Sequence, residues 1–410
     1  MRHRLPPVLR LRSFALLWTA LLTNNFAANM IAVAIGWQVY AIHRNPLDLG
    51  LVGLAEFVPL PLLSLPAGQL ADRVSRKLVS ATAGLIATAI AGLLLTITLV
   101  GPHSIWPFLG VGMLNGIASA IGSPATRALV PELVPSELLE GAIALRSVAG
   151  QIGIVAGPAV GGVIFAVDPI AVYATATGLL AVAFAATVAL PPLVARGADE
   201  PLGWESLVAG VRFVSRNRTI LGAIALDLVA VLFGDAIALA PVFARSILHV
   251  GPIGLGGLRT APPVGALLAG VLLARRPLRF RAGPTLLVVV ATFGAATIVF
   301  GLSKSLPLSL AMLGVTGFVD MISMNIRATT VTLLTPISLQ GRVNAVEWVF
   351  ISASNELGAF ESGAVAAAIG TVRAVVLGGS LMIGFAASWT RLFPDLARLG
   401  RLNELQPEPV

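Results

Sequence analysis

Seven acidic residues lie inside long apolar stretches of the sequence: Glu56, Asp227, Asp235, Asp320, Glu347, Glu356 and Glu361. A carboxylate at the centre of a membrane-spanning helix costs at least about 2.5–3.5 kcal/mol unless it is protonated, paired or hydrated. Such acids therefore indicate a proton or cation path, with polar contacts between helices as the structural alternative. No basic residue is expected at mid-membrane depth to neutralise them, and Arg259 is the nearest candidate.

The depth of each acid follows from its distance along the helix. Asp235, Asp320 and Glu356 are expected about 20–24 Å from one end of their stretches, at 1.5 Å per residue. Asp320 and Arg327 are seven residues apart and therefore lie on one helix face. We expect them either to lie at the two ends of a water path or to pair with residues of other helices. With two amides of the first stretch, the expected substrate and proton pathway comprises Asn24, Asn25, Glu56, Asp227, Asp235, Asp320, Glu356 and Glu361. For the amides, hydrogen bonding between helices is an equal alternative.

The sequence lacks the residues that metal binding, cysteine catalysis and ATP hydrolysis need. There is no cysteine, and the four histidines, His3, His43, His103 and His249, are far apart, so no metal site or cysteine nucleophile is expected. The two lysines, Lys77 and Lys304, follow no glycine-rich phosphate loop, which excludes ATP hydrolysis by a P-loop. We therefore expect neither an enzyme nor a cofactor.

The composition is that of an integral membrane protein. The chain has 410 residues, of which 57% are hydrophobic and 11% charged, whereas soluble domains have about 25% charged residues. Windows of about 20 apolar residues predict an all-α protein with twelve transmembrane helices. The expected spans are 14–40, 48–70, 78–100, 106–128, 142–166, 170–193, 219–244, 254–274, 284–303, 307–329, 343–367 and 372–392.

The basic residues predict the orientation of these spans. With both termini in the cytoplasm, only Arg44, Arg245, Arg259, Lys304 and Arg373 fall outside, which leaves 22 of the 27 Lys and Arg residues inside. We therefore expect a multi-pass protein of the plasma or inner membrane. The net charge of +8 lies in small groups between apolar runs, a pattern that does not favour nucleic acid binding.

The spans divide into two halves of six. We expect an N-terminal six-helix bundle over residues 1–193, a cytoplasmic linker over 194–218 and a C-terminal six-helix bundle over 219–410. The linker has apolar residues at helical spacing beside Arg212 and Arg216, which predicts an amphipathic helix on the inner surface. The halves resemble each other at an offset of about 201 residues, which aligns Gly157 with Gly358 and Gly162 with Gly363. Such a repeat is typical of transporters whose site lies between the halves.

Two sequence motifs lie at places where such a transporter would have a gating loop and a closely packed helix. The segment GQLADRVSRK carries the expected gating-loop residues Gly68, Asp72, Arg73, Arg76 and Lys77, for which a solvated basic loop is the simpler alternative. The fifth span contains the expected helix-packing residues Gly153, Gly157, Pro158, Gly161 and Gly162. Small residues at these steps let helices approach closely, and Pro158 bends the helix.

These motifs resemble signatures of the major facilitator superfamily. GQLADRVSRK resembles its loop between the second and third spans, and GIVAGPAVGG resembles the fifth-span motif of its exporters that run as antiporters. Residues 37–73 and 123–150 are similar to the subfamily of enterobactin exporters and transmembrane secretion effectors. Where many antiporters carry an arginine in the fourth span, this sequence has Gly112.

The resemblance implies the superfamily fold and secondary active transport. We expect export of a small amphipathic organic molecule by alternating access, with protons as the coupling ion. The alternatives are a solute uptake symporter and a non-transporting membrane sensor or scaffold. The expected partners are a small-molecule substrate, the lipid bilayer and protons, with no nucleic acid, and the protein is expected to act as a monomer.

Overall fold

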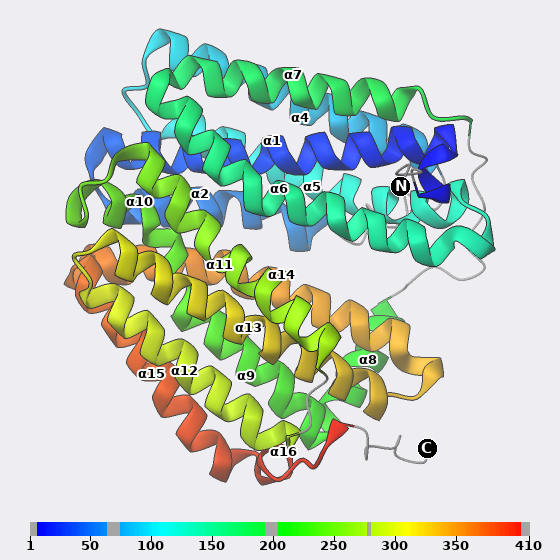
Figure 1. Cartoon of the computed structure of the whole chain (residues 1–410), viewed down its shortest axis with the longest axis vertical. Coiled ribbons are helices and arrows are strands. Elements are labelled where there is room, and N and C mark those ends of the chain that lie inside the picture. Colours follow the sequence, from blue (N-terminus) through cyan, green and yellow to red (C-terminus); the bar gives the residue numbers. More distant parts are fainter. Residues whose placement is uncertain (1–5, 64–73, 193–203, 277–279, 403–410) are drawn as a thin grey trace. The chain divides into compact units, whose positions relative to one another are not determined.

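The computed structural model describes residues 6–63, 74–192, 204–276 and 280–402, and no strand occurs among them (Figure 1). The long helices are α1 (Arg12–His43), α2 (Pro46–Phe57, followed after a turn by a helical segment to residue 63), α4 (Arg76–Val100), α5 (Trp106–Leu133), α6 (Leu139–Val167), α7 (Pro169–Val188), α9 (Arg218–Gly234), α11 (Gly251–Arg275), α12 (Ala282–Leu302), α13 (Leu306–Leu334), α14 (Ile337–Ile369) and α15 (Thr371–Leu392). The shorter elements are η1 (Pro7–Arg10), η2 (Ser136–Leu138), α8 (Trp204–Arg216), η3 (Ala236–Leu239), α10 (Ala240–Val242), η4 (Phe243–Ile247) and α16 (Pro394–Ala397). The helical prediction is confirmed.

Most of the expected spans are long and apolar enough to cross a membrane. Within the described residues, eleven helical segments meet both conditions. The expected eleventh span is not among them, although α14 has 33 residues and would reach about 50 Å. Its acids Glu347, Glu356 and Glu361 lower its hydropathy. The expected number of twelve spans is therefore not confirmed, and α14 needs polar surroundings.

Local signals explain where several helices begin. The Asp168 carboxylate accepts a hydrogen bond from the Ile170 amide at 2.9 Å and caps α7. The Asn217 side chain accepts one from the Ile220 amide at 3.0 Å and caps α9. Proline occupies the first turn of α5, α7, α11 and α13, where its missing N–H breaks no helical bond.

The contacts divide the chain into two compact units. The N-terminal unit consists of Met1–Arg44, Ala55–Pro201 and Gly251–Thr260, and the C-terminal unit consists of Asn45–Leu54, Leu202–Val250 and Ala261–Val410. The first ten residues of α11 therefore pack with the N-terminal unit, and the first part of α2 packs with the C-terminal unit. Each unit thus contains a segment of a helix that continues in the other.

In the N-terminal unit α1 packs against α6 and α7, and α4 packs against α5 and α7 (Figure 1). A buried polar network joins three of these helices. The Tyr173 hydroxyl donates to Gln38 Oε1 at 2.7 Å, and Gln38 Nε2 donates to Thr98 Oγ1 at 3.1 Å. Because each of these groups would be costly to bury alone, the network ties α7, α1 and α4 together.

In the C-terminal unit α12 packs against α13 and α15, and α9 packs against α14 and α15. Trp389 lies in the core of this unit, where its indole N–H donates to the Gly222 carbonyl at 3.0 Å. Its ring contacts Phe385 and Phe393, with centroids 6.2 and 5.1 Å away. This aromatic cluster attaches α15 to α9.

The expected amphipathic helix of the linker is α8, and it packs against α14 and α9. Val214 is buried in a cluster that includes Val343 and Val346 of α14. A Cβ built on Gly210 would lie 2.8 Å from the Arg342 carbonyl oxygen. Part of the apolar face of α8 is therefore covered by protein, whereas the sequence predicted contact with the membrane surface alone.

Gly162 allows α6 and the start of α11 to touch backbone to backbone. A Cβ on Gly162 would lie 2.6 Å from the Pro252 carbonyl oxygen and 3.1 Å from the Cα of Gly256. Real Cβ atoms do not approach backbone this closely, so only glycine fits without a shift of one helix.

The repeat-related Gly363 makes the equivalent contact in the C-terminal unit. A Cβ on Gly363 would lie 2.8 Å from the Pro46 carbonyl oxygen and 3.1 Å from the Cα of Gly50. In each case the partner is a glycine four residues after a proline in the first turn of a helix. The alignment of Gly162 with Gly363 thus corresponds to equivalent packing in the two units.

These contacts predict the effect of adding one methyl group. Gly162→Ala and Gly363→Ala should each destabilise the protein by about 1–3 kcal/mol, because a backbone neighbour cannot rotate away. Gly178→Ala is the matched control, since a Cβ on Gly178 meets nothing within 4 Å. Thermal unfolding in detergent micelles measures the difference. Equal unfolding temperatures for Gly162→Ala and Gly178→Ala would contradict the close contact.

Candidate functional site

The seventh expected span is interrupted at one of its acids. The sequence predicted a continuous helix over 219–244, but α9 ends at Gly234 and Asp235 has φ −75° and ψ 64°. The chain continues as η3, α10 and the π-helical turn η4. Backbone that leaves the α-helix at membrane depth must be buried in protein or face a water-filled cavity. The break therefore marks a polar place in the C-terminal unit.

A cavity of about 210 Å³ lies beside this break, inside the C-terminal unit. Its polar lining includes Asp227, Asp235, Thr297, Asp320, Ser323, Arg327 and Asn355. Apolar residues such as Val290, Phe293 and Met382 complete the wall. We call this space the acid cavity, because it is lined by three expected pathway acids, Asp227 of α9, Asp235 at the break and Asp320 of α13.

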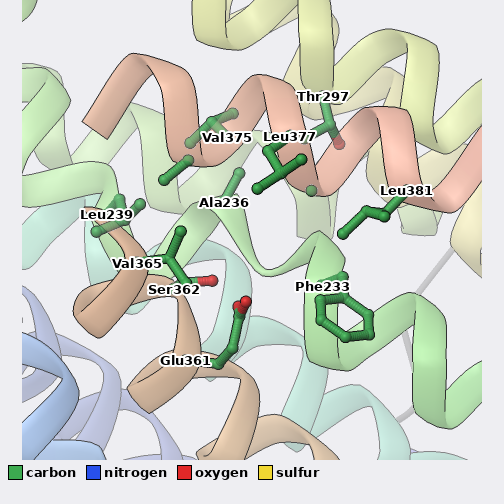
Figure 2. A pocket seen from close by; sticks show the side chains of 12 residues that line it. Phe233, Ala236, Leu239, Thr297, Glu361, Ser362, Val365, Val375, Leu377 and Leu381 are labelled. Atoms are coloured by element: carbon green, nitrogen blue, oxygen red, sulfur yellow. The ribbon is translucent and has the colours of Figure 1, made fainter. Parts of the chain in front are cut away.

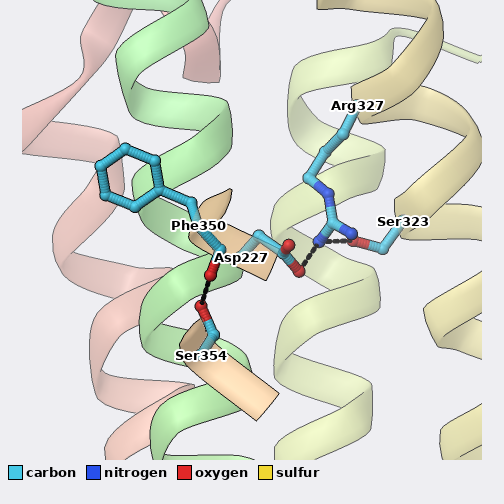
Figure 3. A network of polar contacts seen from close by, with 5 residues as sticks. All are labelled: Asp227, Ser323, Arg327, Phe350 and Ser354. Atoms are coloured by element: carbon cyan, nitrogen blue, oxygen red, sulfur yellow. Dashed lines mark hydrogen bonds and ion pairs between the residues drawn. The ribbon is translucent and has the colours of Figure 1, made fainter. Parts of the chain in front are cut away.

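Asp227 and Arg327 form an ion pair that joins α9 to α13 (Figure 3). Both residues are buried, with 7% and 8% of their surface exposed. The Arg327 guanidinium also donates to Ser323 Oγ at 3.2 Å, one turn earlier on α13. The expectation that no basic residue neutralises the acids is therefore wrong for Asp227. The reason is that α13 continues to Leu334, which places Arg327 two turns inside the helix.

Asp320 and Asp235 add further carboxyl groups to the acid cavity. The residues that line it include three carboxyl groups and one guanidinium, so full ionisation of this lining would leave two excess negative charges. Such an excess among apolar walls is unfavourable unless protons or cations compensate it. The arrangement is suited to binding and releasing a proton or a small cation.

Two other expected acids lie elsewhere in the C-terminal unit. Glu356 is half-buried on α14, and its Oε2 would lie 3.4 Å from a Cβ on Gly53 of α2. Its neighbour Asn355 lines the acid cavity. Glu361 lines a second, smaller cavity with Ser362 and Thr297 (Figure 2). The expected pathway acids of this half are therefore distributed over three places.

The expected pathway residues of the N-terminal unit make local contacts. Glu56 Oε1 accepts a hydrogen bond from Asn115 Nδ2 at 2.7 Å. Asn25 Nδ2 donates to the Leu21 carbonyl of its own helix at 2.7 Å, and its Cβ is in the contact of α1 with Gly153. Asn24 is exposed.

The glycine motif of α6 uses two faces. A Cβ on Gly153, Gly157 or Gly161 would collide with α1, at Asn25, Asn29 and Met30 respectively. Gly162 faces α11 instead, and the Pro158 carbonyl oxygen would lie 2.6 Å from a Cβ on Gly256. The motif therefore packs α6 tightly against two helices.

The expected gating loop is described only at its end. Gly68, Asp72 and Arg73 lie outside the described residues. Arg76 forms an ion pair with Glu132, near the end of α5, and Lys77 Nζ donates to the Leu190 carbonyl just beyond α7. These contacts fix the start of α4 to the ends of two neighbouring helices.

Sequence reasoning missed several residues of these sites. Arg327 was expected on one helix face with Asp320, but its ion pair with Asp227 of another helix was not predicted. Glu132 is the acid nearest the end of the fourth span and could have been paired with the basic loop. For Thr297, one hydroxyl in an apolar run, no sequence signal distinguishes a cavity residue from a packed one.

The sequence of this chain is similar to those of proteins named as exporters. The transmembrane secretion effector family model matches residues 5–402. The enterobactin exporter EntS of Citrobacter koseri is 28% identical over 410 residues, which cover 97% of this chain and 94% of that protein. EntS of Shigella boydii serotype 18 is 26% identical over 408 residues, with the same shares covered.

Solved structures of other transporters have the same fold. A bacterial homologue of the human lysosomal transporter Spinster, inward-facing and unoccupied, has a TM-score of 0.73 at 16% identity, covering 94% of this chain and 98% of that one. The nucleoside transporter NupG has a TM-score of 0.68 at 14% identity, covering 93% and 98%. This chain therefore belongs to the transmembrane secretion effector family of the major facilitator superfamily, whose members are multi-pass membrane transporters and not enzymes.

Proposed function

We propose that this protein exports a small amphipathic organic molecule across the cell membrane by alternating access, driven by protons that enter in exchange. The distribution of basic residues supports an orientation with both termini in the cytoplasm. The direction of transport is supported by the enterobactin exporters, which align with 97% of this chain. The glycine motif of α6 supports exchange, because it resembles the motif of antiporters.

The acid cavity is the observation that carries the proton-coupled part of the proposal. Its volume of about 210 Å³ is below the 300–1,000 Å³ typical of sites for drug-sized ligands. It is therefore better suited to protons and water than to the transported molecule. Asp227, Asp235 and Asp320 supply exchangeable carboxyl groups, and Arg327 stabilises the carboxylate of Asp227, with which it pairs.

The acid cavity contains an arginine, Arg327, whereas the fourth span of this chain lacks the arginine that many antiporters have there. Many antiporters of the superfamily carry an arginine where this chain has Gly112, so a coupling mechanism based on that residue is not available. Among the residues that the structure describes, Arg327 in α13 of the C-terminal unit has a buried guanidinium. We therefore assign proton coupling to the C-terminal unit. The pair of Arg76 with Glu132 supports a gating role for the start of α4, since it joins two helix ends by a contact that a movement could break.

Export can be measured with enterobactin as the first probe. Cells that make enterobactin but lack their own exporter should secrete more of it when they produce this protein, as measured by chromatography of the medium. An increase in cellular enterobactin supplied from outside would instead favour an uptake symporter. No change in either direction, also for a fluorescent amphiphile, would favour a sensor or scaffold.

Coupling can be tested by replacing Asp320 with its amide. Asp320→Asn keeps the shape of the side chain and the pair of Asp227 with Arg327, but it removes one exchangeable proton from the acid cavity. Export by this variant in proteoliposomes should depend less on the pH difference across the membrane than export by the natural protein. Glu137→Gln is the control, because Glu137 is exposed in η2 and distant in sequence from every cavity residue.

A second pair of variants separates coupling from folding. Asp227→Asn leaves the Arg327 charge buried without its partner, which should lower stability by about 3–5 kcal/mol. Removing both charges, with Asp227→Asn and Arg327→Met together, should recover most of that stability but not the pH dependence. An unchanged pH profile in Asp320→Asn and in the double variant would refute the assignment to the acid cavity.

A further inference from the structure

A groove of about 530 Å³ lies between α4 and α5 in the N-terminal unit. Leu93 and Ile97 of α4 line one side of it, and Met113, Leu114 and Ile117 of α5 line much of the other. The groove lies toward the connection between the two helices, because α4 ends and α5 begins there. We call this space the α4–α5 groove.

The two helices pack closely elsewhere along their length. The hydroxyl oxygens of Ser80 and Thr126 are 3.1 Å apart, and a Cβ on Gly122 would lie 2.6 Å from the Cβ of Ala83. In the groove, by contrast, a Cβ built on Gly110 meets nothing within 4 Å. The groove is therefore open space beside a helix pair that is tightly packed at its other end.

The lining of the groove is apolar. Among the described residues that line it, all are Leu, Ile, Val, Met, Pro or Gly, so no charged, hydroxyl or amide side chain is present there. A bound water needs two to four polar partners, which these side chains do not supply. Sites for small organic molecules contain a few polar groups that orient the ligand, and this lining has none from side chains. The chemistry therefore favours a purely hydrocarbon occupant.

The bilayer supplies such an occupant, because α4 and α5 are both long and apolar enough to cross a membrane. Leu93, Met113 and Leu114 are 44%, 46% and 43% exposed, so the groove is accessible from outside the protein. The lining residues of α5 extend from Pro107 to Ile117, which is about 15 Å at 1.5 Å per residue. This length is half of a hydrocarbon core of about 30 Å and thus the depth of one leaflet.

The end of the groove near the helix connection has the residues of a membrane interface. Trp106 is the first residue of α5, is 75% exposed and directly precedes Pro107 of the groove. The exposed His103 lies in the connection just before it. Tryptophan is enriched at the level of the lipid headgroups. The groove therefore begins at headgroup level and extends toward the middle of the bilayer.

We propose that the α4–α5 groove binds one acyl chain of a phospholipid from the leaflet beside the connection of these helices. With both termini in the cytoplasm, this is the outer leaflet. The chain lies against Val111 and Gly110 and gives the lining atoms the dispersion contacts that an empty groove lacks. The headgroup lies at the level of Trp106. This binding is independent of the exported molecule and of its coupling to protons.

The occupant can be identified with a phospholipid that carries a photoreactive diazirine in its acyl chain. The full-length protein is irradiated in liposomes that contain a small fraction of this lipid, and peptide mass spectrometry locates the label. We expect more label on the groove residues of α4 and α5 than on the exposed face of α7 around Gly178. Equal labelling of the two places would overturn the proposal, since contact with bulk lipid alone predicts it.

Gly110→Phe tests the space itself. Its ring should occupy the groove and lower the label there about fivefold, because two groups cannot fill one closely packed space. Gly178→Phe is the matched control and should keep the natural label. Gly178 is likewise an exposed glycine of a membrane-spanning helix, and a Cβ on it also meets nothing within 4 Å. Unchanged labelling of the groove in Gly110→Phe would contradict the bound chain.

Thermal unfolding provides a measurement without any label. Phosphatidylethanolamine added to the delipidated protein in detergent should raise its unfolding temperature, because a ligand that binds the folded state stabilises it. The rise should be smaller in Gly110→Phe than in Gly178→Phe, and equal rises would count against the groove. Met113→Phe fills the groove from an exposed position and replaces Gly110→Phe if that variant does not fold.

Competition distinguishes the lipid from the transported molecule as occupant. Excess enterobactin, used as the probe, should leave the labelling of the groove unchanged. A loss of label with increasing enterobactin would overturn the assignment to a lipid and would make the groove part of the transport path. Failure of enterobactin export, with groove labelling that Gly110→Phe removes, overturns the proposed function and supports the bound lipid.

Discussion

Contact between helix backbones is the constraint on which this structure depends. Helices surrounded by lipid gain little from burying apolar side chains, so their association relies on close packing and on polar contacts. In the N-terminal unit Gly162 brings α6 against the Pro252 carbonyl, and in the C-terminal unit Gly363 brings α14 against the Pro46 carbonyl. Each of these partners belongs to a helix that continues in the other unit. A side chain at either glycine would therefore disturb the segments through which the two units are linked along the chain.

The same apolar surroundings determine where polar groups are tolerated. The helix break at Asp235 exposes backbone groups that need partners, and the two cavities of the C-terminal unit meet there. Desolvating Asp227 and Arg327 costs several kcal/mol per ion, which their mutual attraction offsets only with good geometry. A buried pair is thus a poor device for stability alone. When further carboxyl groups lie beside it, such an ion pair is suited to the proposed exchange of protons, because the arginine compensates a carboxylate charge.

The sequence predicted the features that depend on composition and period. Apolar runs and basic loops gave the helices and their approximate bounds, and the motif glycines were recognisable from their spacing. It did not predict the break of α9, although Gly234 and Pro241 lie on either side of the break and both residue types disfavour the interior of a helix. The pairing of Asp227 with Arg327 and the role of Thr297 in a cavity wall depend on which helices are neighbours. That information lies in tertiary packing and not in the spacing of residues along one helix.

The repeat allows the polar residues of the two halves to be compared position by position. At the offset of 201 residues, Asp320 and Arg327 of α13 correspond to Ser119 and Thr126 of α5, and Glu361 corresponds to Val160. Gly162 and Gly363 both make backbone contacts, whereas Gly161, packed against Met30, corresponds to Ser362 in the wall of the smaller cavity. Exchange of glycine and a hydroxyl-bearing residue at this step converts a dry helix contact into a polar wall. The C-terminal unit thus combines close packing with the buried pair of Asp227 and Arg327, which is the physical basis of our proposal that proton exchange takes place there.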